Sequence, residues 1–239
     1  MSTLKLMKVL FRLKSFSRLS SLTIFLNHCD NDLGHIYQII FHLPFLKYFK
    51  LNILEYENVN FNLSIATDNE FSFIEYLVIH HHLTLNKLTD ILSHTPQLTH
   101  LCCFNVTESK DDIKSETLLK LNNLVHLTIT VHHLTFDEFE EFLVKLSSQL
   151  KILSVTIKNS EKNYLNGFRW EHLISQHIPY LNKFIFCYTD IIDNDLEIKP
   201  CRTLINHFTS PFYLKKQWIF KIFVNNDEII YLMRPSSYI

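Results

Sequence analysis

Histidine is the residue type in this sequence that most readily suggests chemistry. The chain contains 14 histidines, with a run at His80-His81-His82 and a pair at His132-His133. Imidazoles are common ligands for zinc and copper. However, neither group is accompanied by an HExxH or CxxC motif. We therefore expect no metal site, and we interpret both groups as solvated loop histidines that follow a strand.

The sequence contains no motif typical of nucleophilic or acid–base catalysis. There is no G-x-S-x-G motif, and no cysteine lies in a papain-like or caspase-like context. Carboxylates cluster at 137–141, where the dipole of a helix start explains them, and at 190–197, which we expect to be a loop. The two glycines, Gly34 and Gly167, are too few for glycine-rich phosphate-binding loops. We expect neither an enzyme nor a bound cofactor.

Composition narrows the classes of partner. Apolar residues make up 47% of the chain and the net charge is −1, which gives no global field for nucleic acid or anionic lipid. The first sixteen residues are interrupted by four cations, so we expect neither a signal peptide nor a membrane span. An odd number of scattered cysteines favours reduced thiols inside a cell, in the cytoplasm or nucleus; they are Cys29, Cys102, Cys103, Cys187 and Cys201.

The chain is organised by an internal repeat of the form apolar-x-x-apolar-x-apolar. Seven copies occur, with first positions 24 to 31 residues apart; they begin at Leu19, Leu46, Ile74, Leu98, Leu124, Leu150 and Leu181. Leucine-rich repeats run about 20–29 residues with the same core pattern. The last two apolar positions lie two residues apart and so share one face of a short strand. We predict strands beginning near Leu22, Phe49, Leu77, Leu101, Leu127, Leu153 and Phe184.

Between these strands the apolar period changes from two to about 3.6, which indicates helices. The clearest is 136–146, where Thr135 and Glu138 form a capping box and Glu140 is expected to face water. Shorter helical segments are predicted at 36–43, 85–92, 116–121 and 170–174. The predicted fold is an α/β leucine-rich-repeat solenoid, a horseshoe with a parallel sheet on its concave side and helices on its convex side.

The two ends of the array are expected to differ from its middle. Residues 1–18 are predicted to be a helical N-terminal cap or a truncated segment, with a helix at 4–13, and residues 19–207 hold the seven repeats. Aromatic and β-branched residues at 216–224 and 228–233 predict an antiparallel hairpin, with Trp218, Phe220 and Ile222 on one face. We assign residues 208–239 as a C-terminal β cap, which would cover the last sheet edge.

The concave strand face is the predicted binding site for a partner protein. Strand residues that alternate with the buried positions must face outward, and one column of them reads Tyr48, Tyr76, His100 and His126. Aromatic side chains on a rigid surface are enriched at interaction hot spots. The predicted protein-binding residues are Tyr48, Tyr76, His100, His126, Lys50, Val78 and Thr128. The alternative is that the ladder only stabilises the sheet through lateral pairing.

The chain resembles a known family over about residues 15–239, and two segments carry the resemblance most clearly. The stretches 167–174 and 177–184 resemble a late repeat of F-box/leucine-rich-repeat proteins, and Phe208–Phe212 with Gln217-Trp218 resembles the closing segment of a subfamily. The resemblance implies the substrate-recognition part of a cullin–RING ubiquitin ligase, whose adaptor an F-box would dock. The eighteen residues before the first repeat are too few for an F-box. The alternative is a free-standing repeat scaffold unrelated to ubiquitin.

Overall fold

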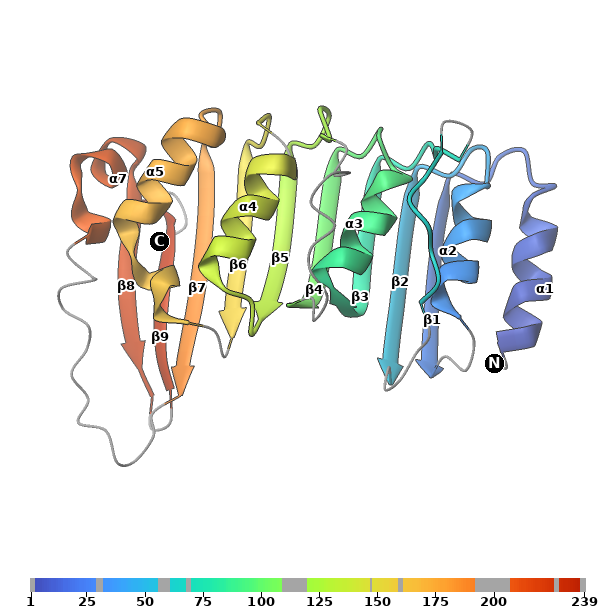
Figure 1. Ribbon diagram of the computed structural model, residues 1–239, viewed down its shortest axis with the longest axis horizontal. Coiled ribbons are helices and arrows are strands. Elements are labelled where there is room, and N and C mark those ends of the chain that lie inside the picture. Colours follow the sequence, from blue (N-terminus) through green and yellow to red (C-terminus); the bar gives the residue numbers. More distant parts are fainter. Residues whose placement is uncertain are drawn as a thin grey trace. The chain divides into compact units, whose positions relative to one another are not determined.

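The computed structural model describes residues 3–28, 32–55, 61–67, 70–108, 120–146, 148–158, 161–191, 207–225 and 228–236. The chain divides into two compact units, Met1–Leu124 and Val125–Ile239, which we treat separately as unit 1 and unit 2. Both units are mixed α/β (Figure 1). The described residues form nine strands, most of them paired in parallel.

Unit 1 alternates strands and helices in the way that the repeat spacing predicts. Its strands are β1 (Ser21–His28), β2 (Tyr48–Glu55), β3 (Tyr76–Thr84) and β4 (His100–Thr107). Its helices are α1 (Thr3–Leu13), α2 (Leu33–Phe41) and α3 (Leu85–Ser93). The strands pair in parallel in the order β1-β2-β3-β4, and the helices lie on one side of them (Figure 1). The four predicted strand starts in this unit are confirmed.

Unit 2 repeats this plan and ends in a hairpin. Its elements are β5 (His126–His132), α4 (Phe136–Leu146), β6 (Ile152–Lys158), η1 (Lys162–Leu165), α5 (Gly167–His177), β7 (Lys183–Ile191), η2 (His207–Thr209), α7 (Pro211–Lys216), β8 (Trp218–Val224) and β9 (Glu228–Pro235). Strands β5, β6 and β7 pair in parallel, whereas β9 joins β7 antiparallel and β8 joins β9 antiparallel. The predicted hairpin is therefore confirmed, and it extends the sheet beyond β7.

The repeat's apolar positions form the core of both units. In repeats two to seven all three positions are completely buried, as Leu46, Phe49 and Leu51 illustrate. In the first repeat Leu19 and Leu22 are only half-buried, because β1 has a strand neighbour on one side alone among the described residues. Each strand buries one apolar face against the helices, and stacked neighbours make that face continuous within a unit.

The observed helices differ from the predicted ones at three places. Helix α2 begins three residues before the predicted start, because the Asp32 carboxylate accepts a hydrogen bond from the Gly34 amide and caps the helix. The predicted helix at 116–121 lies mostly outside the described residues, and the described Lys120 and Leu121 are not helical. Helix α7 was not predicted; Pro211 occupies its first turn, where a missing amide hydrogen costs nothing.

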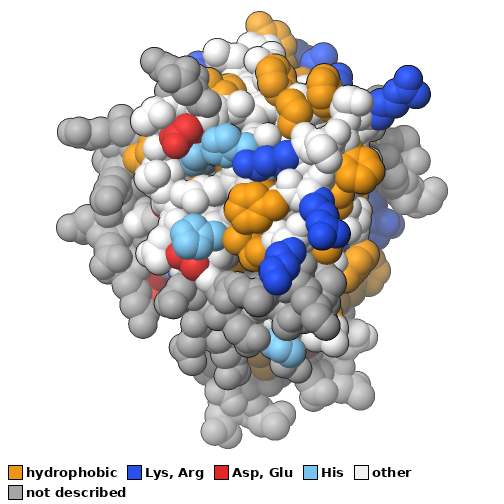
Figure 2. Space-filling view, turned by 90° about the vertical axis from the view of Figure 1, so that its right-hand side faces the viewer, with side chains coloured by type: hydrophobic (Ala, Val, Ile, Leu, Met, Phe, Trp, Pro, Cys, Tyr) orange, Lys and Arg blue, Asp and Glu red, His pale blue; other side chains and the backbone are white. Residues whose placement is uncertain are grey.

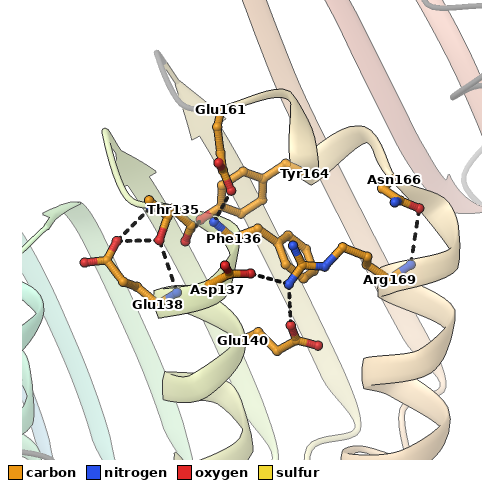
Figure 3. A network of polar contacts seen from close by, with 9 residues as sticks. All are labelled: Thr135, Phe136, Asp137, Glu138, Glu140, Glu161, Tyr164, Asn166 and Arg169. Carbon is orange, nitrogen blue, oxygen red and sulfur yellow. Dashed lines mark hydrogen bonds and ion pairs between the residues drawn. The ribbon is translucent and has the colours of Figure 1, made fainter.

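A polar network joins the start of α4 to the next helix, α5 (Figure 3). The capping box is confirmed, since the Glu138 amide donates to the Thr135 hydroxyl and the Thr135 amide donates to the Glu138 carboxylate. Arg169 of α5 donates to Asp137 at 2.5 Å and to Glu140 at 2.6 Å. The expectation that Glu140 faces water is therefore wrong, because its carboxylate is half-buried against this guanidinium.

Gly34 lies where a second backbone crosses α2. A Cβ atom at this position would lie 2.1 Å from the carbonyl oxygen of Asn62. That neighbour is itself held in place, because the Asn62 amide and side chain both donate to the Asp32 carboxylate. Glycine is therefore needed here because the Asn62 backbone approaches too closely to leave room for a side chain. An unusual backbone angle is not the reason, since the φ of Gly34 is not positive.

Replacing Gly34 by Ala is expected to lower the free energy of unfolding by about 1–3 kcal/mol, the usual range for overpacking in a site that cannot relax freely. Replacing the neighbouring His35, which is exposed, by Ala should change it by less than about 0.5 kcal/mol. Urea denaturation of both variants measures the difference. A Gly34→Ala variant as stable as the wild type would mean that the segment around Asn62 moves away at no cost.

Candidate functional site

The candidate site is the strand face opposite the helices, which we call the open face. In unit 1 the parallel register aligns its side chains in three rows across the strands. The first row is Ser21, Tyr48, Tyr76 and His100; the second is Thr23, Lys50, Val78 and Cys102; the third is Phe25, Asn52, His80 and Phe104. Among these twelve residues, Lys50 is the only one of the Lys, Arg, Asp or Glu type. The open face of unit 1 is thus aromatic and free of carboxylates.

The first row forms a stack of rings. The ring centroids of Tyr48 and Tyr76 lie 5.1 Å apart, and those of Tyr76 and His100 lie 4.9 Å apart with an interplanar angle of 13°. Both faces of the Tyr76 ring are therefore covered, and its side chain is hydrogen-bonded to Cys102, whereas the ring edges remain for a partner. This geometry suits hydrogen bonding to a polar surface better than stacking on a flat ligand. It also supports the alternative that the row stabilises the sheet laterally.

The second and third rows add contacts that the sequence did not single out. The Lys50 ammonium lies 5.7 Å from the centroid of the Phe25 ring, and that ring is 67% exposed. The rings of His80 and Phe104 are 4.2 Å apart. Phe25, His80, Phe104 and Cys102 were missed, although continuing the same two-residue alternation along each strand would have found them. Val78 lies in the predicted row, but its neighbours leave it only 7% exposed.

In the three rows of unit 1, the structure shows shifted pKa values for Tyr76 and His80. Burial raises the pKa of the Tyr76 phenol, and the adjacent Cys102 thiol adds to the shift. Burial, with a smaller contribution from Lys50, lowers the pKa of His80. Both shifts favour the neutral form at neutral pH. These two side chains therefore present hydrogen-bonding groups without charge.

The remaining predicted site residues lie on the strands of unit 2. His126 aligns with Ile152 of β6 and Lys183 of β7, which continues the same kind of row in this unit. The Thr128 hydroxyl lies 3.4 Å from the His126 ring nitrogen Nε2. Both residues are half-buried.

The histidine run does not lie in a solvated loop, so that prediction is wrong. His80, His81 and His82 belong to β3, which continues to Thr84 through a register shift between His80 and Leu83. Because side chains alternate along a strand, His81 points to the helix side and is completely buried. Of the second group, His132 is the last residue of β5, and His133 follows it exposed, in the left-handed region with φ 54°.

The buried His81 is held in one neutral tautomer by two hydrogen bonds. Its Nδ1 lies 3.2 Å from the His82 carbonyl oxygen, which can only accept, so Nδ1 carries the proton. Its Nε2 lies 2.7 Å from the Tyr37 hydroxyl of α2, which therefore donates to it. Burial lowers the pKa of His81 to about 4. This histidine serves the core and is not accessible to a ligand.

Among the described residues, no three His, Cys, Asp or Glu side chains group in a way that would hold a metal ion. Within the same ranges, no helix has both the length and the apolar character that crossing a bilayer requires.

No protein-family model, no curated protein and no solved structure matches this chain.

Proposed function

We propose that this protein is a leucine-rich-repeat solenoid of horseshoe form that binds a partner protein through the open face. The observation that carries the proposal is the aromatic row Tyr48, Tyr76 and His100, held by neighbouring strands. Rigid side chains lose little conformational entropy when a partner covers them, so such a row contributes binding energy efficiently. We place this role inside the cell, in the cytoplasm or nucleus, with no enzymatic step and no cofactor.

Replacing Tyr48 and Tyr76 together by Ala is expected to weaken capture of a bound partner at least about tenfold, since central aromatic residues dominate interface energetics. The wild-type protein and the variant would each be immobilised and exposed to a lysate of the source cells. The amounts of captured partners would then be compared by mass spectrometry. The matched control replaces Phe45 and Phe73 by Ala; both are exposed, at 52% and 60%, and lie in the segments just before β2 and β3. That control should keep the same partners.

The outcome separates binding from sheet stabilisation. Loss of the two rings also removes stacking worth about 0.5–1.5 kcal/mol per pair, so thermal unfolding is measured on each variant. A variant that loses stability but keeps every partner would reassign the row to a purely structural role. Binding would then have to occur elsewhere on the molecule.

We further propose that the repeats are the substrate-recognition part of an F-box-type ubiquitin ligase subunit. In support, the two segments that resemble this family adjoin in unit 2. Gly167, at the start of α5, lies against the backbone of His207 and Phe208. The Phe212 and Trp218 rings of the closing segment lie 5.9 Å apart. Purification of the protein from its source cells, with a search for the cullin–RING adaptor among co-purifying proteins, tests this assignment.

A further inference from the structure

The outer edge of β1 presents main-chain groups with no partner among the described residues. The Ser20 carbonyl accepts hydrogen bonds from the amides of Lys47 and Tyr48, at 2.8 and 3.0 Å. Peptide groups alternate in direction along a strand, so the even-numbered residues of β1 bond to β2. The N–H and C=O groups of Ser21, Thr23 and Phe25 are then directed away from the sheet.

The sequence and register of this edge strand lack the features that usually block strand pairing. Natural edge strands carry prolines, inward-pointing charges or bulges. Residues 21–27 contain no proline and no charged residue. The register of β1 with β2 runs without a bulge from Ser21 to Leu26. Ser21 and Thr23 are exposed, as is the Phe25 ring. The edge is therefore open to a further strand in the described part of the chain.

The segment that leads into β1 is strongly basic. Residues 1–28 contain no Asp or Glu, and four exposed cations, Lys8, Arg12, Lys14 and Arg18, form what we call the basic cluster. Tight turns hold this segment at the start of β1, because the amides of Ser15, Phe16 and Leu19 bond three residues back. Figure 2 looks onto this end of unit 1 and shows Lys and Arg side chains interspersed with hydrophobic ones. In this segment Phe11 and Phe16 are 56% and 58% exposed.

We propose that β1 binds an extended, acidic segment of a partner protein, which adds to the sheet as a further strand. Strand addition draws its affinity from main-chain hydrogen bonds, and here the basic cluster would select acidic side chains. A second copy of this chain fits poorly, because its own β1 carries no acidic side chain for the basic cluster to select. Leu6 and Leu10 of α1 are not available to a membrane surface, because they pack in the core of unit 1. This edge adjoins the open face, because Ser21, Thr23 and Phe25 stand at the ends of its three rows.

The test measures binding of a labelled peptide to the full chain by fluorescence anisotropy. The peptide alternates valine and glutamate over about ten residues, the length of a typical long strand. Thr23→Pro removes an outward amide but no hydrogen bond to β2, and proline is tolerated on edge strands. It is expected to weaken binding at least about tenfold, whereas the matched Thr23→Ala should stay within about twofold. Reversing Arg12, Lys14 and Arg18 to Glu should also weaken binding at least about tenfold and remove its salt dependence.

Each other outcome overturns the proposal. Equal affinity of Thr23→Pro and Thr23→Ala, with loss on charge reversal, would indicate a basic patch that needs no strand pairing. Binding to vesicles of phosphatidylserine and phosphatidylcholine that Thr23→Pro retains, with no peptide binding, would indicate a membrane surface. If Thr23→Pro does not fold, a peptide N-methylated at alternate residues replaces it against the wild-type chain. Undiminished binding of that peptide would exclude strand addition.

Discussion

Replacing Trp170 by Ala is expected to lower the free energy of unfolding by about 3–5 kcal/mol, the range for removing a large buried aromatic side chain. Trp170 is completely buried in unit 2. Its ring lies 5.1 Å from Phe136 and 5.0 Å from Phe184, and its indole N–H donates to the Tyr164 carbonyl at 2.8 Å. Residues of α4, α5, β7 and η1 therefore meet on this one side chain, so the cavity would have no single wall free to collapse.

Urea denaturation measures the loss in the free energy of unfolding, with one dependence on urea concentration fitted to all variants. Trp170→Phe should lie between the wild type and Trp170→Ala, because it keeps most of the packing but leaves the Tyr164 carbonyl without its donor. The control is Tyr180→Ala, because Tyr180 is 61% exposed and its replacement should cost less than about 0.5 kcal/mol. Similar midpoints for Trp170→Ala and Tyr180→Ala would contradict the packing described for unit 2.

Lowering the pH from about 7 to about 4 is expected to remove about 3 kcal/mol of stability through His81, at about 1.4 kcal/mol for each pKa unit. The folded pKa is lowered to about 4, whereas an unfolded histidine has a pKa of 6.5. The unfolded chain therefore binds the proton first, and stability falls as the pH drops from 6.5 towards 4. Protonation would also place a second donor against the Tyr37 hydroxyl. Lys87, His80 and His82 oppose the charge as well.

The difference between variants isolates this effect from the carboxylates. His81→Gln keeps an acceptor for Tyr37 but cannot titrate, so it should be less stable at pH 7 and lose less stability between pH 7 and 5. His133→Gln is the matched control, since His133 is exposed and its replacement should leave the pH dependence unchanged. Parallel stability curves for the wild type and His81→Gln would show that the buried imidazole is protonated without cost.

The strands could be predicted from the sequence because their signal is local. Leu127 and Ile129 lie two residues apart and Leu124 three residues earlier, so spacing alone fixes which side chains are buried. The capping box of Thr135 and Glu138 is equally local. The length of β3 was not predictable in this way, because the bulge after His80 follows from pairing with β4. The burial of His81 depends on that length, which is why the histidine run was misinterpreted.

The candidate site was predictable in position but not in detail. Tyr48 and Tyr76 hold the same position in consecutive repeats, so the repeat pattern was sufficient to predict that they lie side by side. The stacking of these rings and the near-complete coverage of Val78 depend on side-chain conformations, which no spacing encodes. Arg169 illustrates the same limit, because its pairing with Glu140 joins two helices that lie far apart in sequence.

The contact between Gly34 and Asn62 also bears on how related chains would differ from this one. The segment that holds Asn62 belongs to the long connection between β2 and β3, and it can lie against α2 only where no side chain stands in its way. A relative with alanine or serine at the equivalent of Gly34 should therefore carry a shorter or rerouted connection, and should also lack the aspartate equivalent to Asp32. These three features should be inherited together, as a single correlated change, across any lineage that shares this repeat array.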